Sequence, residues 1–232
     1  MFEKYTLVTE VTKMKWPYIC VAGMHFPTES MIRPLTKDHR NWQMRDYYDG
    51  LFKLGNLIEA VADPGINPDE LPHSVEDSIQ EVQPKKIGEL KESEVFEKIK
   101  KYARKNLVDT FQCIPNDNKY YLDKQAKRSL GGIIVDINQF EFNVDDYGLL
   151  RGIFIDNDST KYNFKITSLR ITEDLKKEKL SNIDDINSYL NKTYKEKKNH
   201  INIRLGLARP WNNKGMFSPP RSYIQINELI FS

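Results

Sequence analysis

The residues best suited to catalysis or metal binding are concentrated in residues 71–77, a segment that begins with a Leu-Pro turn. There His73 is followed by two adjacent carboxylates, Glu76 and Asp77. If the segment begins a helix, the spacing puts His73 and Glu76 on one face, where they and Asp77 could ligate a metal ion or form an acid–base pair. The alternative is structural: His73 or Ser74 caps the helix, and both carboxylates lie in its first turn, where the helix dipole favours negative charge. We favour the structural role, then a contact with a partner or with the other half of the chain, and catalysis last.

A second kind of chemistry is the binding of nucleic acid by interleaved cations and aromatic rings. Cations track the backbone and rings stack on the bases, with each stack worth roughly 1–3 kcal/mol. Two segments have this composition, residues 33–45 and residues 209–223. The alternative is that Trp211 and Phe217 only close the hydrophobic core of their half. The candidate nucleic-acid contacts are Arg33, Arg40, Trp42, Arg209, Trp211, Lys214, Phe217 and Arg221.

The charge distribution supports an anionic partner. The chain has 35 basic and 33 acidic residues, so its net charge is only +2. The stretch from Lys197 to Asn227, however, holds six Lys or Arg and no Asp or Glu. Such asymmetry indicates binding to a polyanion, although a run of like charges is also typical of a plain solvated face.

Several reaction classes leave no trace in the sequence. It holds no Walker-type glycine loop, no Gly-x-Ser-x-Gly elbow, no Cys-x-x-Cys and no His-Glu-x-x-His. The two cysteines, Cys20 and Cys113, are isolated and indicate neither a disulfide framework nor a zinc cluster. No apolar run approaches the roughly 18 residues of a membrane span, and the start of the chain lacks a signal-peptide pattern. We therefore expect a cytoplasmic protein with no cofactor, no bound metal and no membrane partner.

The hydrophobic patterning predicts a mainly β protein with two units. Three strands, a helix and two strands in the second half are the element order of an OB-fold, a small five-stranded barrel. We predict two tandem OB-like barrels, over residues 1–115 and 128–232, with a charged helical insertion at about 85–105 in the first and a helix between strands 3 and 4 of the second. The expected strands are 5–11, 18–22, 31–35, 57–62, 133–137, 140–144, 149–155, 162–166, 201–207 and 223–231, and the expected helices are 94–105 and 183–194.

Several segments together resemble one family, the dual OB-containing domain proteins of prokaryotes. The most specific is Pro-His-Ser-Val-Glu-Asp at 72–77, followed by the ending at 206–210 and 223–230, with residues 19–23, 32–35, 49–50 and 57–62 in support. The resemblance implies two OB barrels and nucleic-acid binding in prokaryotic conflict or defence systems, and it supplies no established reaction. The chain departs from the family pattern at Ser78, where an aromatic residue is expected, and in the insertion from Lys85 to Lys105.

The sequence therefore predicts a module that binds single-stranded DNA or RNA and has no catalytic activity of its own. Backbone electrostatics and base stacking would provide the affinity. Two alternatives stay open. One is an adaptor that grips another protein, and the other is a metal-dependent nuclease or nucleotide-modifying factor centred on His73, Glu76 and Asp77.

Overall fold

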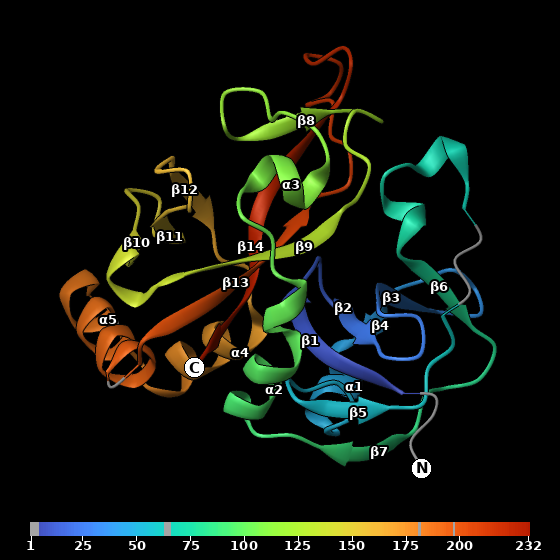
Figure 1. Ribbon diagram of the computed structural model, residues 1–232, viewed down its shortest axis with the longest axis horizontal. Coiled ribbons are helices and arrows are strands. Elements are labelled where there is room, and N and C mark those ends of the chain that lie inside the picture. Colours follow the sequence, from blue (N-terminus) through green and yellow to red (C-terminus); the bar gives the residue numbers. More distant parts are fainter. Residues whose placement is uncertain (1–4, 63–65, 181, 197) are drawn as a thin grey trace.

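The computed structural model describes residues 5–62, 66–180, 182–196 and 198–232. The protein is mainly β, as predicted, and its strands form two curled half-barrel sheets. We call the part of the chain up to residue 89 the first half and the part from residue 120 the second half. Figure 1 shows the first half in blue and teal at the right and the second half in green to red at the left and top. In the described parts of the chain, no helix is both long and apolar enough to cross a membrane.

The first half is built around a meander that is extended on both sides. Its sheet has the order β6-β3-β2-β1-β5-β7, with β4 paired to β2, and the β3–β6 pair is parallel. A short helix, α1 (Met44–Tyr48), follows β4. The strands are β1 (Thr6–Lys13), β2 (Tyr18–His25), β3 (Ser30–Thr36), β4 (Trp42–Gln43), β5 (Asn56–Ile58), β6 (Asp77–Gln80) and β7 (Lys86–Glu89).

Strand β1 is buried on both faces because it separates two cores. Val8 and Val11 pack into the core of the first half, whereas Leu7 joins a cluster that includes residues of the second half. A β-bulge between Val8 and Glu10 shifts the alternation by one residue. Glu10 consequently faces the second half, where its carboxylate oxygens accept hydrogen bonds from Arg204 Nε at 3.0 Å and from an asparagine of β14 at 2.8 Å.

The second half contains two sheets that approach each other through one bridge. Their orders are β10-β11-β12 and β8-β14-β13-β9, and Ile166 pairs with Ile226 in parallel between them. Two helices, α4 (Leu169–Lys177) and α5 (Ile183–Leu190), lie between β12 and β13, in the place where the sequence predicted one helix. The strands are β8 (Tyr120–Leu122), β9 (Leu130–Asp136), β10 (Phe140–Val144), β11 (Leu150–Ile155), β12 (Lys161–Lys165), β13 (His200–Leu207) and β14 (Arg221–Phe231).

The predicted helical insertion at 85–105 is only partly helical. Its first residues form β7, which pairs with β5, and the helix proper is α2 (Glu92–Ile99). The next helix, α3 (Leu107–Phe111), places Leu107 and Phe111 in the hydrophobic core of the second half. Strand β7 has only four residues, which is too few to show a clear alternation of apolar and polar side chains. Its extended conformation depends instead on backbone pairing with β5.

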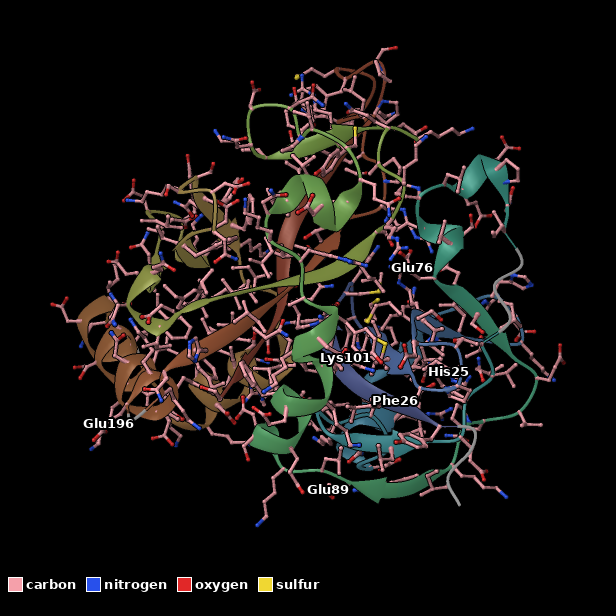
Figure 2. The ribbon with its side chains drawn as sticks, in the orientation of Figure 1. His25, Phe26, Glu76, Glu89, Lys101 and Glu196 are labelled. Atoms are coloured by element: carbon pink, nitrogen blue, oxygen red, sulfur yellow. The ribbon has the colours of Figure 1, made fainter. Side chains whose placement is uncertain are left out.

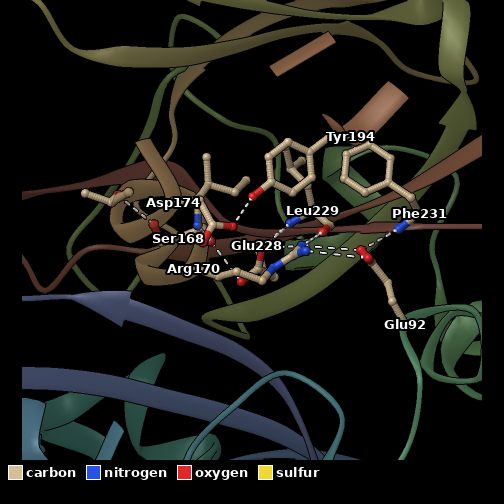
Figure 3. Close-up of polar contacts among 10 residues, drawn as sticks. Glu92, Ser168, Arg170, Asp174, Tyr194, Glu228, Leu229 and Phe231 are labelled. Atoms are coloured by element: carbon tan, nitrogen blue, oxygen red, sulfur yellow. Dashed lines mark hydrogen bonds and ion pairs between the residues drawn. The ribbon is translucent and has the colours of Figure 1, made fainter. Parts of the chain in front are cut away.

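Helix α2 is attached to the second half by a partly buried ionic cluster, shown in Figure 3. Arg170 at the start of α4 donates to Glu228 at 3.1 Å and to the carbonyl oxygen of Leu229 at 2.6 Å. The same guanidinium lies 3.3 Å from Glu92 of α2, and Glu92 also accepts from the backbone N–H of Phe231 at 3.1 Å. Because Arg170 bonds to both Glu92 and Glu228, helix α2 and strand β14 are held together at this point.

Candidate functional site

The segment with the predicted histidine–carboxylate cluster lies where the two halves meet. His73, Ser74 and Val75 form a single 3-10 turn, and strand β6 begins at Asp77. The expected helix start is therefore wrong, because β6 pairs with β3 and draws the chain into an extended conformation. His73, Glu76 and Asp77 are all buried.

His73 is neutral and bonded across the junction. Its Nε2 lies 3.0 Å from the carbonyl oxygen of Leu207 in the second half, and since a carbonyl only accepts, Nε2 carries the proton. Burial, together with the charges of Arg33 and Arg209, lowers the pKa of His73 to about 3. The imidazole therefore acts as a hydrogen-bond donor that joins the halves.

Glu76 makes the next contact between the halves, and Figure 2 labels it at the point where β6 approaches the segment leading into β9. Its carboxylate accepts from the backbone N–H of Ser129 at 3.1 Å and from the Ser129 hydroxyl at 2.8 Å. Burial raises the pKa of Glu76 to about 7 despite the opposing charge of Arg33. The group is thus held by fixed donors from the other half.

Asp77 is clamped between two arginines. Arg33 of β3, itself only 4 % exposed, pairs with one carboxylate oxygen, and Arg209 donates to the other at 2.6 Å. Burial opposes ionisation of Asp77, but the two guanidinium groups outweigh it and hold its pKa below the usual value. Arg33 also donates to Ser129 at 2.9 Å, so the network closes on itself.

The network has the geometry of an interlock between the halves. Each of the three side chains that the sequence singled out is bonded to a residue of the second half, and they do not converge on a common open position. In the residues that the structure describes, no group of three or more His, Cys, Asp or Glu is arranged to hold a metal ion. We call this set of six residues the junction network: Arg33, His73, Glu76, Asp77, Ser129 and Arg209.

A second cluster, which is partly exposed, comes from β8 and from the loop that leads into β14, at the top of Figure 1. The Arg221 guanidinium lies over the Phe217 ring at 4.0 Å and over the Tyr120 ring at 4.5 Å. Trp211, half of whose surface is exposed, has its ring 5.6 Å from that of Phe217 and 6.3 Å from that of Tyr223. Reciprocal backbone hydrogen bonds of 3.0 Å between Trp211 and Arg221 hold the base of the loop. We call these five residues the tip cluster.

Sequence reasoning placed four members of the tip cluster, including Tyr223, in the candidate segment 209–223 and missed Tyr120. Trp211, Phe217 and Arg221 were predicted from the composition of one loop. Tyr120 comes from β8, about a hundred residues earlier, and meets Tyr223 only because β8 pairs with β14 in that register. No local spacing reports such a pairing, although the neighbouring tyrosines at 120 and 121 do stand out in the sequence.

The remaining predicted contacts divide between surface and interior. Arg40 and Lys214 are exposed, and Arg209 is exposed but paired with Asp77. Arg33 and Trp42, in contrast, are buried, which differs from the surface position that a nucleic-acid contact needs. Trp42 donates its indole N–H to the carbonyl oxygen of Pro34 at 2.8 Å and is part of the first-half core. The predicted basic loop at 33–45 therefore lacks its aromatic platform.

Comparison with known proteins agrees with this architecture. No curated protein and no solved structure shows a significant match to the chain. The family described as Dual OB-containing domain matches residues 8–228, which include both halves, the junction network and the tip cluster. Because the match extends over nearly the whole sequence, the chain belongs to the Dual OB-containing domain family.

Proposed function

We propose that the protein binds single-stranded nucleic acid through the tip cluster. The observation that carries this proposal is the exposed Trp211 beside an arginine that lies over two rings, Phe217 and Tyr120. Bases stack on such rings without regard to sequence, and the guanidinium adds a cation for the backbone. Lys214 supplies a further charge, and the stretch from 197 to 227 has no carboxylate to oppose it.

The proposal includes two OB barrels, one in each half. In the second half, the strand order 10-11-12, the parallel bridge to β14 and the pairing 14-13-9 support a barrel in which β9 and β10 form one bent strand. In the first half, β6 pairs with β3 and β7 with β5, which supports β6 and β7 as one bent last strand. We propose these barrels for the ranges 1–115 and 128–232. OB-folds commonly bind oligonucleotides, so the fold favours the same ligand.

Fluorescence anisotropy with labelled 20-nucleotide DNA and RNA strands at low salt tests the proposal. The native protein should bind, and Trp211→Ala should weaken binding by about 1–3 kcal/mol because one base loses its stacking surface. Affinity should fall steeply with added salt, since phosphate contacts release counterions. A matched control is Tyr147→Ala, which removes a ring that is 88 % exposed in the turn between β10 and β11. Absence of binding by the native protein would refute the proposal.

We do not extend the proposal to catalysis. His73, Glu76 and Asp77 are occupied by hydrogen bonds and ion pairs across the junction, and their role there accounts for the clustering that first suggested an acid–base pair. The proposed module acts by holding a strand, in keeping with the family's association with prokaryotic conflict or defence systems.

A further inference from the structure

Two clefts lie on either side of the turn that connects β1 and β2. The junction cleft, about 260 Å³, is lined by residues of both halves, among them Arg33, His73 and Arg209. The lysine cleft, about 690 Å³, lies against β12 and α4. Lys13, Met14 and Lys15 line both clefts, so the two spaces adjoin along this turn.

The walls of both clefts carry cations and no carboxylates. Among the described residues, neither lining includes an Asp or a Glu. Two cations already have partners: Lys176 pairs with Glu173 at 2.5 Å and Arg209 pairs with Asp77. In the part of the chain that the structure describes, the other exposed cations of the linings make no salt bridge; they are Lys13, Lys15, Lys165 and Lys179. Four positive charges without a salt bridge in the described structure, along adjoining clefts, form a field that attracts a polyanion.

Two residues that line the junction cleft, His73 and Asn227, each have a buried acceptor atom without a partner in the described structure. His73 donates through Nε2, which leaves Nδ1 as an unprotonated acceptor with no hydrogen bond in the described structure. Asn227 donates its amide to Glu10, and its carbonyl oxygen is likewise unpartnered. Both residues are at least 96 % buried, and a buried acceptor left unpaired is costly. A ligand suited to this cleft therefore carries hydroxyl or amino donors as well as negative charge, as a nucleotide does.

We propose that the two clefts form one groove that holds the backbone of a bound single strand. This inference rests on the proposed function and extends its surface: Arg209 lies two residues before Trp211, so a strand stacked on the tip cluster can continue past Arg209 to Lys15 and the lysine cleft. The same turn presents Trp16, which is 71 % exposed and offers another stacking surface. The groove thus gives the strand a path from the tip of the second half to the junction of both halves.

A charge-removal experiment tests the groove. The variant Lys15→Gln/Lys165→Gln/Lys179→Gln takes one cation each from the turn, from β12 and from the end of α4. With labelled 20-nucleotide strands, its affinity should fall about tenfold at low salt, and the slope of log affinity against log salt should become shallower by roughly 2, because three phosphate contacts are lost. The control is Lys85→Gln/Lys161→Gln/Lys192→Gln, which removes three exposed lysines that make no salt bridge in the described structure and lie outside both clefts. It should keep the native slope.

The outcomes separate the groove from the tip cluster. If the native protein binds, Trp211→Ala weakens binding and the groove variant keeps the native affinity and slope, then the groove is refuted and the proposed function stands. Equal losses in the groove variant and its control also refute the groove, because they would reflect net charge alone. If the native protein binds neither strand, both proposals fail. Urea unfolding of each variant verifies that the fold is retained.

Discussion

The junction network and the tip cluster share only arginine among their residue types, and their surroundings are opposite. Both combine cations with groups that could contact a ligand, and both attract attention in the sequence for that reason. At the junction, Arg33, Glu76 and Asp77 each have a partner from the other half and almost no contact with solvent. At the tip, Trp211 and Lys214 face solvent. The density of functional residue types therefore does not distinguish a ligand site from an interlock, whereas burial and pairing do.

The two regions differ in burial because their segments pair with different parts of the fold. Residues 71–77 lead into β6, whose pairing with β3 carries them to the interface, and charges taken out of water there require compensation. The loop after β13 is held only at its base by the Trp211–Arg221 bridge. Tyr120 of β8 contacts Arg221 beside this loop, but Trp211 and Lys214 of the loop remain exposed.

The largest expected effect is on the stability of the junction. Arg33→Ala leaves Asp77 and Glu76 buried with less compensation, and breaking such a buried pair costs about 3–5 kcal/mol. Urea unfolding should show this loss in the free energy of unfolding. Arg40→Ala, at an exposed position seven residues later, is the control and should stay within about 0.5 kcal/mol of the native protein. A loss below about 1 kcal/mol for Arg33→Ala would show that the junction network is not an interlock.

A smaller effect should appear in the pH dependence of stability. Glu76 has a pKa of about 7 in the fold against 4.5 in the unfolded chain, so the folded state holds the extra proton between these values. Stability therefore falls as pH rises from about 4.5 to about 7, by about 3 kcal/mol, and then levels off. Glu76→Gln should remove this contribution, so its stability relative to the native protein should increase over that range in unfolding measurements at several pH values.

His73 should contribute with the opposite sign. Its pKa is lowered from 6.5 to about 3, so the unfolded chain binds more protons between these values and stability rises with pH there. The difference in the free energy of unfolding between the native protein and Glu76→Gln reports the contribution of the Glu76 carboxylate alone, because His73 is present in both. A difference that does not change between pH 4.5 and 7 would show that Glu76 is not held protonated at the junction.

The smallest effect concerns Arg209, which connects the two regions. Its side chain is 46 % exposed, and Asp77 keeps Arg33 when Arg209 is removed. Arg209→Ala should therefore cost no more than about 1 kcal/mol of stability. A double-mutant cycle with Asp77→Asn measures this coupling by urea unfolding. A coupling energy as large as the stability loss expected for Arg33→Ala would show that Arg209 acts chiefly as a structural contact, and it would argue against a part for Arg209 in strand binding.

Local pattern was sufficient for most of the fold. The apolar run at 18–22 lies in β2, the segment 31–35 in β3 and the alternation at 162–166 largely in β12, because a strand with one buried face leaves that signal. The family assignment was confirmed over residues 8–228. The helix at 94–105 was also found, although it ends earlier, at Ile99.

The candidate sites were less predictable because they depend on long-range packing. The turn Lys13-Met14-Lys15-Trp16 was not among the candidate contacts, since its lysines meet the further lysines beside β12 and α4 only in the tertiary structure. Trp42, like Trp211, lies in a segment with several basic residues, but it is buried in the hydrophobic core of the first half. A single sequence does not record which of two similar tryptophans is covered.

The sequence by itself determined the mainly β architecture and the charge asymmetry of the C-terminal stretch, because these follow from hydrophobic period and composition. Only the tertiary structure decided the roles of the polar residues. The pairing of β6 with β3 buried His73, Glu76 and Asp77, while the loop with Trp211 remained uncovered. The physical reason is that a charged group changes from ligand contact to structural tie when a distant strand removes its water and supplies its partner.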